Sequence, residues 1–279
     1  MPAMKTTIIL ALALLLLSAC DSVDSGEFDD PIVVEAFLFA GEPIDDIHLS
    51  SVLPIDSEDT LATPINDADV RLVKGGASYT LIPSGTEGFY HYPGGGLAVE
   101  TGDVFRLEVD YGSTRITAET TVPAPPTGVS MALTQITVPN VGDDFFAIRE
   151  LFQALNEENT LSVTWDNPEA ESYFVALEAP ANDNPDYLLP EFIRDRFGGF
   201  RIVTEPTTTN FYDIPIFSLE VIGAYTTTVY RINQEYADLY ENREQDSRDL
   251  NEPPTNIDGG LGVFSAFNGQ SITFQIVRE

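Results

Sequence analysis

The sequence predicts a mainly β protein made of two β-sandwich domains, the second with short helical insertions. Three observations favour this fold class. Short runs alternate apolar and polar residues with a period of two, as at residues 105–109, which is typical of strands with one buried face. Turn signals that contain glycine separate these runs. A proline cluster at residues 123–126 divides them into two groups, because prolines stiffen a linker into an extended form.

Residues 1–20 are predicted to be a lipoprotein signal peptide. Lys5 supplies a positive charge near the start, and residues 8–17 are an apolar run too short to span a bilayer. Two small residues then precede Cys20, the only cysteine of the chain. This pattern matches the lipobox, in which the thiol receives a diacylglycerol, and the alternative is an ordinary secretory signal with a chance cysteine. We predict that Cys20 is lipidated and that its acyl chains anchor the protein in a membrane.

The chain is strongly acidic, with 13 Lys and Arg against 45 Asp and Glu and a formal net charge of −32. Loss of the leader removes Lys5 and no acid, which leaves −33 on the mature chain. Nucleic acid is therefore not an expected partner, because phosphate binding needs clustered cations. Acids spread over nearly every predicted loop indicate a salt-adapted surface. A hydrophobic fraction of 43%, with 17 Phe and 11 Tyr, favours packed cores over a disordered acidic chain.

Residues 21–30 are predicted to form an acidic tether directly behind the lipidated cysteine. Two interpretations of its acids stay open. An acidic patch at this position resembles a signal for display on the cell surface in some Gram-negative groups, and the alternative is a solvated linker. The face of the membrane that carries the protein, periplasmic or cell-surface, is therefore left open.

Residues 31–123 are predicted to form the first sandwich, with about seven short strands. The first strand is expected at residues 32–39, and strands at 70–74 and 78–82 flank a Gly-Gly hairpin turn. Strands at 104–110 and 115–122 flank a second glycine turn. The segment from PINDADVRLVKGG to GFYHYPGGG resembles the prealbumin-like domains of surface proteins, which implies an immunoglobulin-like or prealbumin-like fold.

Residues 127–279 are predicted to form the second sandwich. The stretch TLSVTWDNP at 160–168 and the run at 172–178 resemble the B and C strands of a fibronectin type III domain. This resemblance places Trp165, the only tryptophan, in the core. Further strands are expected at residues 216–222, 226–233 and 271–277.

Three amphipathic segments predict helical insertions in this second sandwich. They lie at residues 145–155, at 190–197, and from Asn233 onwards, where Tyr236 and Tyr240 share a face. Such a face either covers the protein's own sheet or docks a partner. The first role is the expected one for an isolated helix of ordinary length.

Four motifs together indicate a family. They are the lipobox, the first-strand sequence VVEAFLFAGEP, the core WDNP, and NIDGGLGVF at residues 256–264. Over most of the mature chain they resemble the domain of unknown function 4249 family, outer-membrane lipoproteins of Bacteroidota-type bacteria. Members are often encoded beside TonB-dependent outer-membrane receptors. The resemblance implies an outer-membrane location and an accessory role in nutrient uptake with such a receptor as partner, and it transfers no catalytic or ligand residue.

The glycine-rich segment at residues 256–264 is expected to be a structural turn. Gly259, Gly260 and Gly262 permit positive φ or close backbone approach, so the segment is predicted to fold tightly against the sheet before the last strand. The alternative is a loop that cradles phosphate. Its spacing is not the dinucleotide fingerprint, and no Lys-Ser/Thr pair follows the glycines.

The residues with potential for catalysis or metal binding are few. His48 and His91 are the only histidines and lack zinc-site spacing, so a structural role is expected for each over a ligand role. Residues 182–186 could offer oxygens to Ca²⁺ but lack the glycine and distal glutamate of an EF-hand loop, which favours a solvated turn. No G-x-S-x-G elbow is present. We therefore predict no catalytic, cofactor or metal residue, and lipidation of Cys20 as the one site.

These observations predict a membrane-anchored binding or accessory module, and not an enzyme. One alternative is a surface structural or adhesive module, for which repeats would be expected and are absent from the sequence. A second is a hydrolase of surface polymer, which needs a buried acid pair or a metal cluster. The ligand and the oligomeric state are left open by the sequence.

Overall fold

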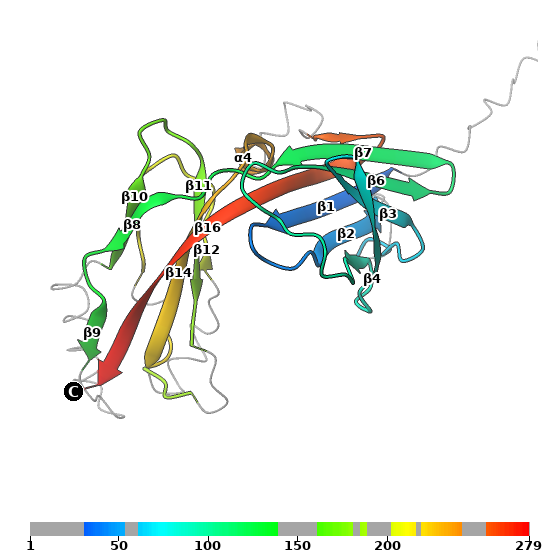
Figure 1. The fold of residues 1–279 in the computed structure, drawn as a ribbon. Helices are drawn as coiled ribbons and strands as arrows, with labels where there is room; N and C mark the ends of the chain where they lie inside the picture. Colours follow the sequence, from blue (N-terminus) through cyan, green and yellow to red (C-terminus); the bar gives the residue numbers. More distant parts are fainter. Residues whose placement is uncertain are drawn as a thin grey trace, which may run out of the picture. The chain divides into compact units, whose positions relative to one another are not determined.

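A computed structural model describes residues 31–53, 61–138, 161–180, 185–188, 202–215, 219–241 and 255–278. All of them lie in one compact unit, Pro31–Glu279. Cys20, the predicted tether and the predicted helices at 145–155 and 190–197 lie outside the described residues. Strands dominate the described part, which confirms the mainly β fold class (Figure 1). No helix in this part is long and apolar enough to cross a membrane.

The N-terminal strands follow the predicted pattern closely. All five strands expected between residues 32 and 122 are present, within one or two residues of the expected ends. The elements are β1 (Ile32–Phe39), β2 (Asp46–Ser51), β3 (Asp69–Lys74), β4 (Ala77–Pro83), β5 (Phe89–His91), β6 (Val104–Tyr111) and β7 (Thr114–Thr121). Their inward side chains form one large core, in which Val34, Leu72 and Leu107 are fully buried.

The β3–β4 hairpin shows why the local sequence predicts so much of this half. Gly75 and Gly76 have φ values of +57° and +82°. A two-residue turn with positive φ at both positions matches the right-handed twist of its strands, and glycine adopts it without a steric cost. The register therefore runs in step from Lys74↔Ala77 to Val70↔Leu81.

The C-terminal strands form two facing sheets. The elements are β8 (Thr127–Met131), β9 (Gln135–Val138), β10 (Ser162–Asp166), β11 (Tyr173–Glu178), β12 (Ile202–Val203), β13 (Phe211–Asp213), β14 (Gly223–Arg231), β15 (Ile257–Asp258) and β16 (Leu261–Arg278). One sheet has the order β13-β10-β8, and the other includes β12-β11-β14-β16. The predicted B and C strands, β10 and β11, lie in different sheets, as in an immunoglobulin-like sandwich.

Trp165 lies in the core between these two sheets. It is 2% exposed and packs with Val163, Tyr173, Val175 and Val229. Its ring centroid lies 5.6 Å from that of Tyr173. The prediction that Trp165 is a core residue is therefore confirmed.

A tyrosine corner closes the second sandwich at the start of β14. Tyr225 is 1% exposed, and its hydroxyl accepts hydrogen bonds from the amides of Glu220 and Val221 at 3.0 and 2.9 Å. The same hydroxyl donates to the Val221 carbonyl oxygen at 3.0 Å. A tyrosine that bonds back to backbone a few residues upstream is a hallmark of immunoglobulin-like sandwiches. Burial raises the pKa of the Tyr225 hydroxyl above its usual value.

The same corner corrects the prediction of a strand at residues 216–222. Residues 219–222 form only an isolated bridge, Tyr187↔Val221, and 216–218 lie outside the described residues. The amide of Val221 bonds to the Tyr225 hydroxyl instead of to a strand. The backbone amide of Ile222 donates to the carbonyl oxygen of Asp186, and the backbone amide of Leu188 donates to the carbonyl oxygen of Glu220. The apolar residues here are therefore buried around the tyrosine corner and do not form a strand of a sheet.

Removal of the Tyr225 hydroxyl should destabilise the second sandwich. In Tyr225→Phe, two backbone amides lose their acceptor in a buried site, and each unsatisfied group costs about 1–3 kcal/mol. Urea unfolding should therefore show a loss of at least about 1 kcal/mol. Tyr212→Phe is the matched control, because its hydroxyl has no hydrogen-bond partner among the described residues. An equal loss in both variants would contradict the corner's role.

The final strand differs most from the prediction. β16 is one 18-residue strand, whereas the sequence indicated a strand at 271–277. Its first half pairs in parallel with β1, from Val33↔Leu261 to Phe39↔Phe267. Its second half pairs antiparallel with β14, from Arg231↔Asn268 to Gly223↔Ile276. Figure 1 shows β16 running from beside β1 to beside β14, and the order β14-β16-β1 belongs to one continuous sheet.

Part of the C-terminal range therefore packs in the first core. Ile257, Phe264 and Ala266 are buried there with the side chains of β1 to β7, and β15 pairs with β7. Residues 257–267 thus complete the first sheet, although the sequence placed them in the second sandwich, residues 127–279. Alternation in a strand shows which side chains are buried but not which sheet receives them.

The predicted third helix is α4 (Gln234–Glu241). The Asn233 carbonyl accepts hydrogen bonds from the amides of Tyr236 and Ala237. Tyr236 packs edge-on against Phe37 and Phe267, at centroid distances of 5.7 and 4.8 Å. The apolar face of α4 therefore covers the protein's own strands, which is the role expected from its length.

Candidate binding cleft

A cleft of about 1030 Å³ lies over the outward face of β1 and β2. Alternation along β1 sends Val34 and Ala36 into the core and turns Val33 and Glu35 outward. On β2, Ile47 and Leu49 are buried while His48 lines the cleft. The antiparallel register sets Glu35 directly opposite His48. Residues on neighbouring strands that face each other in this way lie close enough for their side chains to interact.

His48 is held on several sides. Its Nδ1 lies 3.3 Å from Glu35 Oε2, and its ring centroid lies 4.6 Å from that of Phe89 on β5. Gly88 packs against the ring, because a Cβ at this position would lie 2.7 Å from His48 Nε2. The φ of Gly88 is +78°, so a side chain there would also strain the backbone. The imidazole therefore has little freedom, and the exposed carboxylate of Glu35 lies within reach of its Nδ1.

The opposite wall of the cleft is apolar. Residues 61–65 lie along the end of β2, where the amide of Ile65 bonds to the Leu49 carbonyl at 3.0 Å and that of Ser51 to the Thr63 carbonyl at 2.9 Å. This wall carries Leu53 and Leu61, which are 38% and 81% exposed. Large exposed leucines beside a concave surface are typical of a binding site.

The charge of the cleft is negative. Glu35 and Glu87 line it, and no lysine or arginine among the described residues does. Within the described part of the chain, every arginine and lysine lies in an ion pair elsewhere. These residues are Arg71, Lys74, Arg106, Arg115, Arg231 and Arg278.

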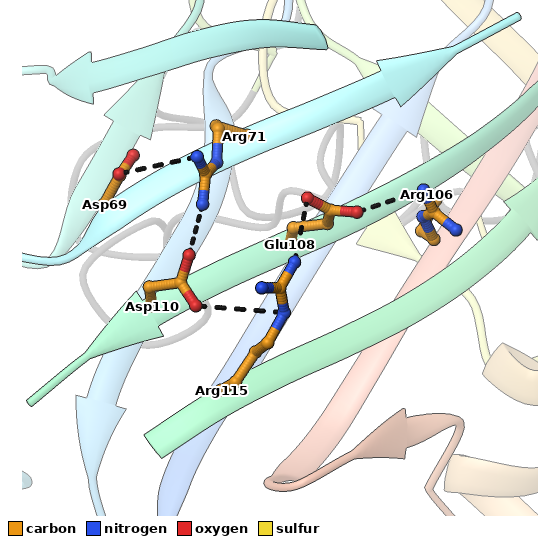
Figure 2. Close-up of polar contacts among 6 residues, drawn as sticks. All are labelled: Asp69, Arg71, Arg106, Glu108, Asp110 and Arg115. Atoms are coloured by element: carbon orange, nitrogen blue, oxygen red, sulfur yellow. Dashed lines mark hydrogen bonds and ion pairs between the residues drawn. The ribbon is translucent and has the colours of Figure 1, made fainter. Parts of the chain in front are cut away.

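Half of those cations gather on the outer face of β3, β6 and β7 (Figure 2). Arg71 bonds to Asp110 and lies 3.7 Å from Asp69. Arg115 lies 3.4 Å from Glu108, and Arg106 lies 3.1 Å from the other oxygen of Glu108. The three arginines are therefore paired with carboxylates of the same face.

Sequence reasoning missed both the cleft and this ion-pair network. The network had a partial signal, since Arg106 and Glu108 are two apart on the strand predicted at residues 104–110 and must share a face. The cleft had none, because Glu35, His48 and Leu61 meet only through strand pairing.

The histidines and the acidic segment named from the sequence do not form one site. His91 lies on β5 and its buried Nδ1 has no hydrogen-bond partner among the described residues. Asp186 forms an ion pair with Arg278, with Oδ1 at 3.0 Å from the guanidinium, and residues 182–184 lie outside the described residues. No group of three His, Cys, Asp or Glu that could hold a metal is present in the described part.

The glycine-rich segment folds tightly against the sheet, as predicted. A Cβ at Gly259 would lie 2.4 Å from the Arg115 carbonyl oxygen, and one at Gly262 only 2.0 Å from that of Val34. The side chain of Asn256 donates to the Phe264 carbonyl at 2.7 Å and accepts from the Phe264 amide at 3.0 Å. The space that a phosphate would need beside these glycines is filled by the backbone of β1 and β7.

Comparison with known proteins agrees with the motif resemblance. A family model described as a domain of unknown function, DUF4249, matches residues 21–273. The chain belongs to this family. The DUF4249 match begins directly after Cys20 and extends over strands of both sandwiches, including β16 as far as residue 273.

No curated protein matches the chain significantly. Among solved structures, the chain is similar to a crystal structure of consecutive domains from titin, with 13% identity and a TM-score of 0.21. That match covers 73% of this chain and 61% of the titin chain, so less than two thirds of the titin structure is spanned. The sandwich assignment for this DUF4249 protein rests on its own strand pairing and tyrosine corner.

Proposed function

We propose that this protein is a lipid-anchored binding protein of the outer membrane that works with a TonB-dependent receptor in nutrient uptake. The observation that carries the binding role is the cleft beside His48. An apolar concavity with a few convergent polar groups is the form in which proteins hold small ligands. The lipobox at Cys20 and the DUF4249 membership support the membrane location and the receptor partner.

A short tether sets where such a protein can act. Residues 21–30 span at most about 35 Å when fully extended, so the cleft stays close to the membrane that holds the lipid. Each buried CH₂ contributes about 0.8 kcal/mol, so several acyl chains make the attachment effectively permanent. A ligand held in the cleft is then presented at high local concentration to a receptor in the same membrane.

Capture from native membranes tests this function. The full-length chain with a C-terminal affinity tag is expressed in its own host, extracted with mild detergent and captured. Mass spectrometry should show one TonB-dependent receptor enriched over an unrelated tagged lipoprotein. Metabolic labelling with a fatty-acid analogue should mark the same captured protein.

Cys20→Ala supplies the matched control. This variant should lose the lipid label, leave the membrane fraction and lose the receptor, because only the anchor has changed. Equal labelling of Cys20→Ala would show that the lipobox assignment is wrong. If the labelled wild type repeatedly brings down no receptor, the uptake role fails and the structural or adhesive role takes its place.

A further inference from the structure

We propose that the cleft over β1 and β2 binds a small organic cation with an apolar body, such as a hydrophobic amine, with Glu35 as its counter-ion. This inference rests on the proposed binding role and adds the chemical class of the ligand. The cleft volume of about 1030 Å³ is at the upper end of the range found for small-molecule sites. This volume is compatible with a small-molecule ligand.

The apolar wall selects the body of the ligand. Leu61 is 81% exposed and Leu53 38% exposed, and Val33 and Leu261 line the cleft across from them. An apolar ligand removes these side chains from water, which is favourable in proportion to the area covered. A purely polar ligand would leave them exposed.

The charges around the cleft favour a positively charged ligand. Glu35 is 58% exposed and has His48 as its partner among the described residues, while Glu87 has no ion-pair partner there. In the part of the chain that the structure describes, no lysine or arginine lines the cleft, and the whole chain carries a net charge of −32. The field of such a protein repels anions and concentrates cations. Beside apolar walls, a carboxylate attracts a cation more strongly than it does in bulk water.

The position of Glu35 makes it the anchor. Its strand, β1, is paired on both edges, by β2 and β16. One carboxylate oxygen lies against His48, which is itself packed by Phe89 and Gly88. A charged group held on rigid strands loses little freedom when a ligand binds. Glu87 lies in the loop before β5 and is the secondary charge.

Three probes with one indole body test the class. Tryptamine is cationic, tryptophol is neutral and indole-3-acetate is anionic, and saturation-transfer NMR measures their binding to the mature lipidated protein in zwitterionic nanodiscs, with empty nanodiscs subtracted. Tryptamine should bind about fivefold more tightly than tryptophol. Indole-3-acetate should bind more weakly than either.

Two charge-removing variants distinguish a specific contact with Glu35 from the effect of the protein's overall negative charge. Glu35→Gln should reduce the affinity for tryptamine about fivefold and leave tryptophol unchanged. Glu119→Gln removes the same charge from an exposed site on β7, outside the cleft, and should change neither the affinity for tryptamine nor that for tryptophol. Leu61→Ala should weaken the binding of both tryptamine and tryptophol. Because Glu35 and Leu61 are exposed, thermal melting should show these variants folded.

Two results would overturn the proposal. One is equal binding of tryptamine and indole-3-acetate, or no binding of any probe. The other is an equal loss in Glu35→Gln and Glu119→Gln, which would mean that tryptamine follows diffuse charge. Either result, with the receptor still captured from membranes, removes the ligand class and leaves the proposed function standing. If the probes bind as expected but no receptor is captured, the ligand class stands and the uptake role fails.

Discussion

Replacing Gly262 with alanine is expected to cost roughly 3–5 kcal/mol of the free energy of unfolding. Gly262 has a φ of +107°, where L-residues are strained. A Cβ there would lie 2.0 Å from the carbonyl oxygen of Val34 and 2.9 Å from its carbonyl carbon. Those atoms belong to β1, which pairs with β16 at this point. The two strands must therefore separate or the backbone must rearrange, and urea unfolding measures the loss.

Gly102→Ala is the control for this substitution. Gly102 has a comparable positive φ of +83°, but a Cβ there meets no atom within 4 Å. Only backbone strain is then introduced, which costs roughly 1–2 kcal/mol. If the two variants lose equal stability, the contact between β1 and β16 is not what requires glycine at position 262.

Truncation of Trp165 should have an effect of similar size on the second sandwich. Removing a buried tryptophan side chain costs roughly 3–5 kcal/mol, a large part of the roughly 5–15 kcal/mol that holds a domain folded. The other members of its cluster, on β10, β11 and β14, lose their packing partner together. Hydrogen exchange should therefore show amide protection falling first in these strands. Urea unfolding of Trp165→Ala gives the total loss.

Two further substitutions test the cause of this effect. In Trp165→Phe most of the ring volume is kept, and a buried indole N–H that has no hydrogen-bond partner in the described part is removed. This variant should lose much less than Trp165→Ala. Phe211→Ala removes an aromatic ring that is 49% exposed and should change stability by about 0.5 kcal/mol or less. A melting curve of Trp165→Ala equal to that of wild type would contradict a core role.

Local patterns predicted the elements whose cause is local. The β3–β4 hairpin follows from two glycines that accept positive φ, and β1 from strict alternation over Ile32–Phe39. α4 follows from Asn233 at its start and Tyr236 on its apolar face. The strand expected at 216–222 was wrong because a hydroxyl four residues away takes the amide that a strand would need. No short window of sequence shows that competition.

By itself, the sequence determined the fold class, the core position of Trp165, the tight glycine turn and the family. These depend on periodicity, on φ preferences and on motifs, all of which are present in short stretches of chain. Only the tertiary structure decided that β16 completes both sandwiches, and that Glu35, His48 and Leu61 line one cleft. The physical reason is that strand pairing joins residues far apart in the chain, and alternation identifies a buried face without naming the strand that will lie beside it.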